Sequence, residues 1–408
     1  MSPLSREQLI LSIHHIGGRA GTRPFPQAGK LESNLQNVLY EADTSCIPQM
    51  HDAVKVFSSE QVILPYCIAD KQGKTPFYLR GSRYNSSMFK RPEGYVSHYM
   101  YNPQFGWDED PTSRGISEVV ELETVSLDQL FKGAQPPPAL PPHFLSIDAE
   151  GAEFAILKGA ERVLREHTLM VQVETSLIPN WEGAGTFADI QNYLATLGFT
   201  LHHMDMFDYQ GNSPNRYPIG TRSGRGGSTM GEATFIKKRG VIAAEHSEPA
   251  LDLLKLSLFC LLHDWLEKGY DLLDAALEQG AEAILQQAAE TGSPFLSFME
   301  RLAALLAEHP EVYPLLYRQF FPDNDAQRDR FNQDPLAPGS DALRKAYFSE
   351  ADAKVIRDNL SWLMAEEATE LEQLFLDNQS ITIAENLRNA RLNQIIDLLS
   401  LLGLAKNT

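Results

Sequence analysis

This 408-residue sequence predicts an α/β fold followed by an all-α domain, on three observations. Residues 1–239 alternate short apolar or β-branched runs with helix-like patterns, which is typical of a sheet with crossover helices. Residues 240–408 are rich in leucine and alanine at helical spacing and show almost no strand pattern. The net charge is −19, and most of it lies in residues 241–408, which have 28 acidic and 13 basic side chains, while residues 1–240 are nearly balanced. We therefore expect a domain boundary near residue 240.

Seven short runs are candidate strands, because each is apolar or β-branched and is bounded by turn-forming residues. In chain order they are Ile10–Ile16, Asn37–Tyr40, Gln61–Tyr66, Phe144–Ile147, Leu169–Val173, Phe199–Met204 and Ala233–Lys237. The long section 70–143 separates the third run from the fourth and closes in the stiff spacer "PPPALPP". A section of this length is more typical of a substrate-binding elaboration than of a linker, so we expect it on the substrate side of the domain.

Composition disfavours several classes of partner. A net charge of −19 opposes binding to nucleic acid or to anionic membranes. No apolar stretch approaches the roughly 20 residues that span a bilayer, and we expect no signal peptide. The scattered cysteines Cys46, Cys67 and Cys260 argue against a disulfide framework or a thiolate metal site and favour the reducing cytoplasm. The leucine stripes of the acidic helical domain indicate a core, a homo-oligomer interface or a surface for a basic protein partner, and these stay open.

A glycine cluster follows the first candidate strand: Gly17, Gly18 and Gly21 in "HIGGRAG". Glycines there let the backbone approach a cofactor closely and supply amide donors. Glu41 follows the next strand, where an acid can take the ribose hydroxyls of a nucleotide-containing cofactor. The full Gly-x-Gly-x-x-Gly pattern is not met, so an adenosine cofactor smaller than NAD is favoured. A plain turn is the alternative.

Three acids lie where the fourth candidate strand meets a helix: Asp148, Glu150 and Glu153 in "FLSIDAEGAEFAIL". Ligands bind open α/β sheets at the carboxyl ends of their strands, which is where Asp148 and Glu150 belong. The helix dipole favours a carboxylate in a first helical turn and accounts for Glu153 without any function. It does not account for three acids. We therefore interpret Asp148 and Glu150 as functional and leave Glu153 divided between capping and function.

The stretches "SIDAEGAEFAILKGAERVL" and "LMVQVETS", with "HIGGRAG" and "YNSSMF" in the same order, resemble the FkbM-type S-adenosylmethionine-dependent methyltransferases. The resemblance covers roughly residues 9–238. It implies a class I methyltransferase (Rossmann-like) fold, with a seven-stranded sheet whose last strand is antiparallel. It also implies methyl transfer from S-adenosylmethionine to a hydroxyl of a sugar, glycan or natural-product acceptor.

On this resemblance, Asp148 or Glu150 orients or deprotonates the acceptor and Glu153 assists. The same carboxylates also suit Mg²⁺, and the sequence does not separate the two roles. The expected cofactor-binding residues are Gly17, Gly18, Gly21, Glu41, Cys67, Ile68 and Asp70, and the expected substrate-binding residues are Tyr84, Asn85, Ser86 and Ser87. His15 stands where family members usually carry an acid. The alternative reading is therefore a catalytically degenerate scaffold that works through its helical domain.

Overall fold

The computed structural model describes residues 3–17, 25–92, 115–132, 137–206, 230–263 and 265–308. Spatial contacts divide the chain into two units. The first consists of Ile10–Arg23 with Leu35–Asp252, and the second of Met1–Leu9, Pro24–Asn34 and Leu253–Thr408. The division after Asp252 falls inside helix α9 (Pro249–Leu262). The boundary expected near residue 240 from charge and composition stays a prediction.

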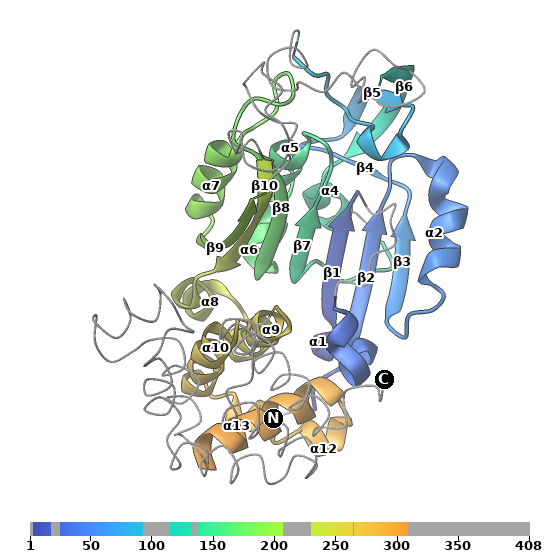
Figure 1. Cartoon of the computed structure of the whole chain (residues 1–408). Coiled ribbons are helices and arrows are strands. Elements are labelled where there is room, and N and C mark those ends of the chain that lie inside the picture. Colours follow the sequence, from blue (N-terminus) through green and yellow to red (C-terminus); the bar gives the residue numbers. More distant parts are fainter. Residues whose placement is uncertain are drawn as a thin grey trace, which may run out of the picture. The chain divides into compact units, whose positions relative to one another are not determined.

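A seven-stranded sheet forms the centre of the first unit (Figure 1). Its strands are β1 (Leu11–Ile16), β2 (Leu35–Tyr40), β3 (Glu60–Leu64), β7 (Phe144–Ile147), β8 (Met170–Ser176), β9 (Phe199–Met206) and β10 (Met230–Lys237). The strand order is β3-β2-β1-β7-β8-β10-β9, with neighbours parallel from β3 through β8. The last strand, β10, pairs antiparallel with both β8 and β9. All seven predicted strands are present, and the expected mostly parallel α/β sheet is confirmed.

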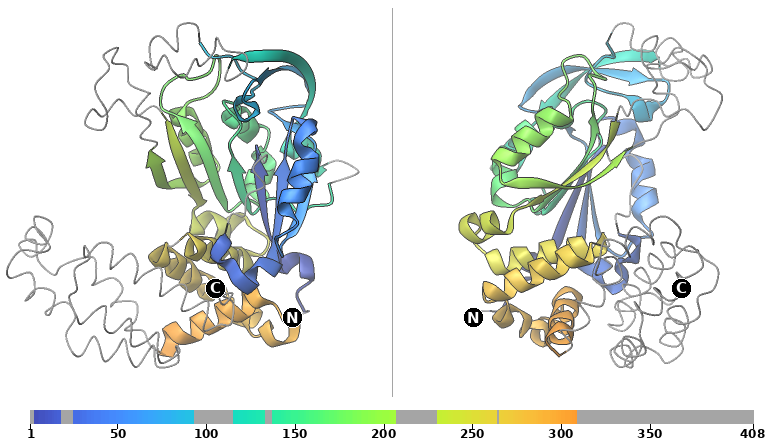
Figure 2. Two further views of the ribbon diagram at one scale, coloured as in Figure 1. Left: turned by 45° about the vertical axis from the view of Figure 1, so that its right-hand side comes forward. Right: turned by 60° about the vertical axis from the view of Figure 1, so that its left-hand side comes forward.

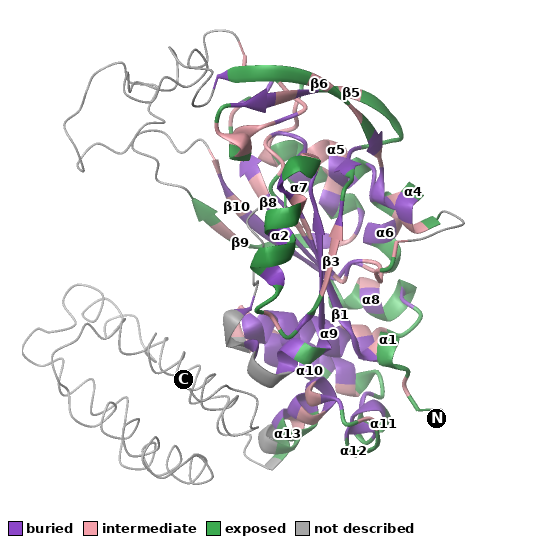
Figure 3. Ribbon diagram, turned by 90° about the vertical axis from the view of Figure 1, so that its right-hand side faces the viewer, coloured by how far each residue is buried: buried purple, intermediate pink, exposed green. Residues whose placement is uncertain are grey.

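Helices cover both faces of this sheet (Figure 2). They are α2 (Ile47–Val54), α4 (Leu127–Lys132), α5 (Glu153–Lys158), α6 (Glu161–Glu166) and α7 (Phe187–Thr196). Helix α8 (Arg239–Glu245) follows β10. Successive residues of a strand point to opposite faces. Accordingly, Val38 and Tyr40 join the core cluster that includes side chains of α4 to α7, whereas Leu39 packs with Met50 and Val54 of α2. The central strands are buried from both sides (Figure 3), which explains their nearly continuous apolar runs.

The section between β3 and β7 builds a second, three-stranded sheet. It contains β4 (Cys67–Ile68), β5 (Gly73–Arg80) and β6 (Ile116–Val125), in the order β4-β6-β5. The 3-10 helix η4 (Arg83–Asn85) follows β5. Much of β6 is exposed (Figure 3). The described part of the predicted insertion, residues 70–143, is therefore ordered structure attached to the carboxyl side of β3.

The described part of the second unit is helical. It contains α1 (Arg6–Leu9), the 3-10 helix η2 (Pro26–Asn34), most of α9, α10 (Leu266–Glu278), α11 (Glu282–Leu285), α12 (Ala288–Thr291) and α13 (Pro294–Glu308). Asn34 joins its sequence-distant parts, because its Nδ2 donates to Leu9 O (3.3 Å) and Ser293 Oγ (3.2 Å), and its Oδ1 accepts from Phe295 N (3.1 Å). The expected all-α domain is thus seen as far as residue 308, and the rest of that prediction lies outside the described residues.

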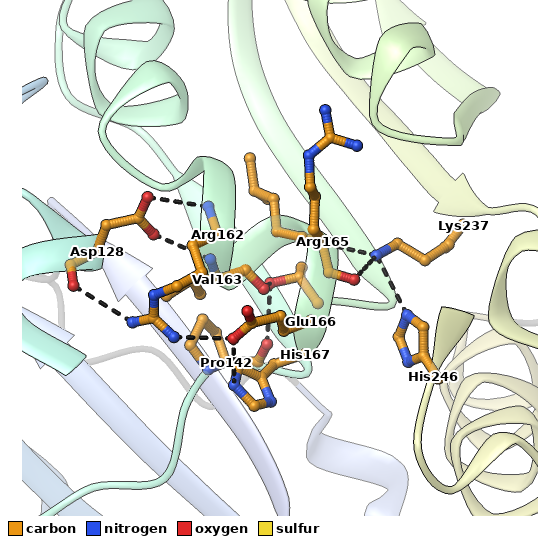
Figure 4. Close-up of polar contacts among 11 residues, drawn as sticks. Asp128, Pro142, Arg162, Val163, Arg165, Glu166, His167, Lys237 and His246 are labelled. Carbon is orange, nitrogen blue, oxygen red and sulfur yellow. Dashed lines mark hydrogen bonds and ion pairs between the residues drawn. The ribbon is translucent and has the colours of Figure 1, made fainter. Parts of the chain in front are cut away.

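Polar side chains hold both ends of α6, near the amino ends of the parallel strands (Figure 4). Asp128 accepts from the backbone N–H groups of Arg162 and Val163, each at 2.9 Å. At the other end, Lys237 Nζ donates to the backbone oxygens of Leu164 and Arg165. Carboxylates suit the N-terminus of a helix and ammonium groups its C-terminus, so both contacts stabilise this short helix.

Among the described residues, no helix combines the length and the apolar character that crossing a bilayer requires.

Candidate functional site

A cavity of about 320 Å³ opens at the carboxyl ends of β1, β2 and β7. It is lined by His15, Ile16, Gly17, Tyr40, Glu41, Ala42, Tyr66, Cys67, Ile68, Phe77, Arg83, Tyr84, Ser86, Met88, Asp148, Ala149, Glu150, Ala152 and Ile156. These residues come from the ends of three neighbouring parallel strands, from the β7–α5 turn with the start of α5, and from the β4–β5–η4 region. The location agrees with the rule that open α/β sheets bind ligands beyond the carboxyl ends of their strands.

Gly17 brings the end of β1 against the end of β7. Its φ is +94°, and a Cβ atom at this position would lie 1.9 Å from the backbone oxygen of Asp148. The amide of Gly17 donates to Tyr40 O (3.2 Å), and Asp148 N donates to Ile16 O (3.0 Å). Glycine is therefore required at position 17, because any side chain meets fixed backbone in a conformation that L-residues rarely adopt.

Glu41 lies at the carboxyl end of β2 and is buried. Its Oε1 accepts from the amide of Asp43 at 2.8 Å, which holds the carboxylate in one orientation. Cys67 and Ile68 line the same cavity. Burial, and then the charge of Glu41, raises the pKa of the Cys67 thiol to about 12. Cys67 is thus a neutral, weakly polar part of the wall.

The turn between β7 and α5 carries the acidic cluster. Glu150 has φ +52°, in the left-handed region that non-glycine residues seldom occupy. Ser87 Oγ donates to the backbone oxygen of Glu150 at 2.6 Å. Glu153 Oε1 accepts from Ala149 N (2.9 Å) and Gly151 N (3.0 Å). Backbone strain of this kind persists where surrounding contacts enforce it, and it clusters at functional sites.

The turn is also held from outside by Trp181. Gly151 has φ +101°, and a Cβ there would lie 2.6 Å from the indole ring of Trp181. The guanidinium carbon of Arg91 lies 3.8 Å from the ring centroid of Trp181, and that of Arg80 lies 5.6 Å from it. Both arginines act electrostatically on Glu150. Two cations stacked on one aromatic ring therefore flank the acidic turn.

Burial and mutual repulsion raise the pKa values of three acids at this edge, Glu150, Glu153 and Glu174. Burial raises the pKa of Glu150 to about 7, with Asp148 and Glu153 adding to the rise and Arg91 opposing it. Burial likewise raises the pKa of Glu153 to about 7, against the hydrogen bonds from backbone amides. Burial, and then the charges of Asp148, Glu150 and Glu153, raise the pKa of Glu174, on β8, to about 9. Glu174 therefore keeps its proton at neutral pH and can act as a hydrogen-bond donor toward Asp148.

Most of the residues predicted from the sequence meet in the cavity. They are Gly17, Glu41, Cys67, Ile68, Tyr84, Ser86, Asp148 and Glu150. Four do not line it. Asp70 is exposed, because the chain turns outward after β4. Glu153 and Ser87 are buried in the turn contacts described above, and Asn85 Nδ2 donates to Ser82 Oγ (3.0 Å). Gly18 and Gly21 lie outside the described residues.

Several residues of the site were missed by sequence reasoning. Glu174 ends "LMVQVE" on the neighbouring parallel strand, so the rule that selected Asp148 also selects this acid. Arg83 lies in a stretch, residues 71–92, that contains six basic and no acidic residues, which is a detectable signal in an acidic chain. Phe77 and Met88 have no signal in the sequence. Their places in the wall depend on how the second sheet packs.

Within the described part of the chain, no group of three or more His, Cys, Asp or Glu side chains is arranged to hold a metal ion.

A seven-stranded, mostly parallel sheet with a cavity at its carboxyl edge defines the class, an α/β protein consistent with a Rossmann-like methyltransferase. Residues 36–201 match the family model of the methyltransferase FkbM domain. This segment is therefore similar to the FkbM methyltransferase domain, as the motifs predict.

A search of solved structures found a crystal structure of Methyltransferase FkbM from Methylobacillus flagellatus KT, with 12% identity and a TM-score of 0.27. The likeness covers 56% of this chain and 43% of that one. The search of curated proteins found no match.

Proposed function

We propose that this protein is an S-adenosylmethionine-dependent O-methyltransferase that acts on a hydroxyl of a sugar, glycan or natural-product acceptor. One observation carries the proposal. Gly17, Glu41 and Asp148, which follow three different parallel strands, line a single cavity. The FkbM methyltransferase domain supports methyl transfer as the reaction.

The residues around Gly17 and Glu41 fit the cofactor. Gly17 brings backbone to the cavity wall, and Glu41 presents an oriented carboxylate that can accept from both ribose hydroxyls. Cys67 and Ile68 offer a neutral wall for the adenine. When bound, S-adenosylmethionine supplies an electrophilic methyl group on a sulfonium. The carboxylates nearby complement that positive charge.

Asp148 is the proposed base. A sugar hydroxyl is a weak nucleophile, and its proton must leave as the new bond to carbon forms. In our proposal Asp148 accepts that proton, and Glu174 orients Asp148 through the shared hydrogen bond. Glu150, in its strained turn, contacts the acceptor from the same side. Positioning of donor and acceptor supplies much of the remaining acceleration.

Calorimetric titration with S-adenosylhomocysteine tests the cofactor half of the proposal. We expect binding by the wild type and a loss of affinity of about tenfold or more in Glu41→Gln, since a hydrogen bond to a charged group contributes about 1.5–3 kcal/mol. Asp70→Asn is the matched control: it also removes an acid that follows a strand, here β4, but an exposed one outside the cavity. A wild-type protein that does not bind S-adenosylhomocysteine contradicts the proposal.

Release of S-adenosylhomocysteine over a panel of glycosides, oligosaccharides and hydroxylated natural products tests the transfer half. We expect turnover with at least one hydroxyl acceptor and no turnover with the same acceptor once that hydroxyl is O-methylated. Turnover only with amines or thiols would contradict O-methylation while leaving cofactor binding intact.

A non-catalytic scaffold is the second candidate, and one observation favours it. The described residues of the β1–β2 connection form the 3-10 helix η2 and not an α-helix beside the glycine loop, and His15 precedes that loop. A scaffold of this kind binds neither S-adenosylmethionine nor its product. The same titration therefore separates the two candidates.

We also propose the cytoplasm as the location, since all three cysteines are free and buried, as suits a reducing compartment. That the helical unit forms a homo-oligomer interface or a protein-binding surface stays a prediction. Sedimentation of the full chain tests it.

A further inference from the structure

A basic segment adjoins the cavity of this acidic protein. Residues 71–92 contain six basic and no acidic residues, in a chain with net charge −19. The segment forms β5 and η4, and it contributes Phe77, Arg83, Tyr84, Ser86 and Met88 to the cavity wall. Clustered positive charge beside a ligand cavity indicates recognition of negative charge.

The cations of this segment differ in what they contact. Lys74 forms an exposed ion pair with Glu121 (2.8 Å) on the second sheet. Arg91 is stacked on Trp181 and acts on Glu150. Arg83 has neither kind of partner: its Nη1 is buried and makes no hydrogen bond within the described part of the chain. Of these three cations, only Arg83 lines the cavity.

A buried guanidinium nitrogen without an acceptor is destabilising, because its hydration is lost and not replaced. The positive charge is shared over the whole planar group, so an anion on the cavity side compensates it. Guanidinium groups match carboxylate and phosphate oxygens in geometry as well as in charge. Arg83 therefore has the properties of an anion-binding side chain.

The position of Arg83 assigns the anion to the acceptor and not to the cofactor. Arg83 shares η4 and its flank with Tyr84 and Ser86, which offer hydroxyl groups to a polar acceptor. Ser87 Oγ ties this segment to the backbone of Glu150, in the acidic turn that bears the proposed base. The elements that fit the cofactor, Gly17 and Glu41, follow other strands.

We propose that Arg83 binds an anionic group, a carboxylate or a phosphate, on the hydroxyl-bearing acceptor, so that acidic sugars are the preferred substrate class. This inference rests on the proposed methyltransferase function. It goes further by naming the charge of the acceptor and the residue that selects it.

Binding to the full-length protein saturated with S-adenosylhomocysteine tests the inference without requiring turnover. Saturation-transfer NMR is recorded with matched neutral and anionic sugars: methyl glucoside against methyl glucosiduronate, methyl galactoside against methyl galactosiduronate, and glucose against glucose 6-phosphate. We expect the anionic member of at least one pair to bind more tightly. The uronates and the phosphate distinguish which anion is recognised.

Arg83→Met should lower the affinity for that anionic sugar about tenfold or more, the usual effect of losing a charge-assisted hydrogen bond. Lys90→Met is the matched control, because it removes an exposed cation of the same segment that does not line the cavity. If Arg83→Met does not fold, Arg83→Gln replaces it.

Three results would overturn the inference: equal binding of both members of every pair, no binding of any anionic member, or unchanged binding in the Arg83 variant. A loss of S-adenosylhomocysteine affinity in the Arg83 variant, with acceptor binding unchanged, would reassign Arg83 to the cofactor. Failure of the proposed function is distinguishable, because the wild type would then not bind S-adenosylhomocysteine at all.

Discussion

The two ends of the central sheet differ in how their charged groups are neutralised. At the amino end of the parallel strands, Lys237 is buried, and its ammonium donates to two backbone oxygens at the C-terminus of α6 (Figure 4). It also contacts His246 Nε2 (3.3 Å), whose Nδ1 in turn bonds Asp252 (2.8 Å). Each donor there meets a fixed acceptor. This charge holds α6 to β10 and α8.

At the carboxyl end, by contrast, acids lie close to one another: Glu150 and Glu174 are half-buried and Asp148 is exposed. Asp148 raises the pKa of Glu150 and of Glu174, and Glu150 raises that of Glu174 further. The cavity lies directly beside this group. Charged groups that have partners within the protein stabilise the fold. Charged groups that protons or ligands neutralise can take part in binding and catalysis. The following predictions test this difference, from the largest effect to the smallest.

Asp148→Asn should lower kcat by about 10²–10⁴-fold, the range that a positioned general base contributes. The amide keeps the shape of the side chain but cannot take the proton of the acceptor. Affinity for S-adenosylhomocysteine should stay within about threefold by calorimetry, since the cofactor contacts proposed for Gly17 and Glu41 are intact. An active Asn variant would refute the assignment of Asp148 as the base.

Lys237→Met should lower the stability of the fold and not the affinity for the cofactor. We expect a loss of about 2–4 kcal/mol in the free energy of unfolding in urea, because two helix-end carbonyl groups and His246 lose a charged donor. S-adenosylhomocysteine affinity of the folded protein should not change. The control is Lys238→Met, an exposed neighbour that should stay within about 0.5 kcal/mol of wild type. A Lys237 variant as stable as the control would mean that the buried charge is not structural.

Gly17→Ala should cost about 2 kcal/mol or more, because it combines a positive φ with a Cβ placed against Asp148 O. Gly183→Ala separates the two causes. Gly183 has φ +76°, and a Cβ there would meet no described atom within 4 Å, so its cost should be only the backbone strain of about 1 kcal/mol. Equal losses in the two variants would show that the contact between β1 and β7 is looser than the structure indicates.

Glu153→Gln should change how stability depends on pH. The folded-state pKa of Glu153 is about 7, above its ordinary value of 4.5, so the native protein binds more protons in this interval. The contribution of this group is therefore full below pH 4.5 and is lost as the pH rises through 7. Gln stays neutral and can still accept from Ala149 and Gly151. Urea titrations should show the variant gaining on wild type by roughly 1–3 kcal/mol between pH 5 and 8.

The rate of the same variant decides between the two interpretations of Glu153. If this side chain only holds the turn, kcat of Glu153→Gln stays near that of the wild type. If Glu153 assists proton transfer, kcat falls tenfold or more.

Glu174→Gln should have the smallest effect at neutral pH, with kcat within a few-fold, because the amide still donates to Asp148 as the protonated acid does. The difference should emerge in alkaline solution. There the wild type loses the proton of Glu174 and its rate declines, whereas the Gln variant has no such proton to lose. Glu174→Ala, which removes the donor, should be slow at every pH. Identical pH–rate profiles for wild type and Gln would rule out a positioning role.

Much of the fold could be predicted from the sequence because it depends on local patterns. Strand cores such as Phe144–Ile147 are short apolar runs that end at turn residues, and the seven predicted runs correspond to seven observed strands. Asp148 and Glu150 were identifiable for a related reason. The carboxyl end of a buried strand is a position readable from order along the chain.

Other features depend on contacts between residues distant in the sequence. Glu153 holds the turn, whereas Glu150 lines the cavity. This difference depends on the φ of +52° at Glu150, which the spacing of the acids does not encode. Asp70 matched the expected position but faces solvent. Phe77 and Met88 became part of the cavity wall only through the packing of the second sheet.

By itself, then, the amino-acid order determined the strands, the helices and the acid-bearing edge, because hydrophobic periodicity and glycine placement act over a few residues. Tertiary structure decided which acids have a raised pKa, which line the cavity and which cation lacks an acceptor. Those properties depend on burial and on distances across the fold, and electrostatic interactions change steeply with both.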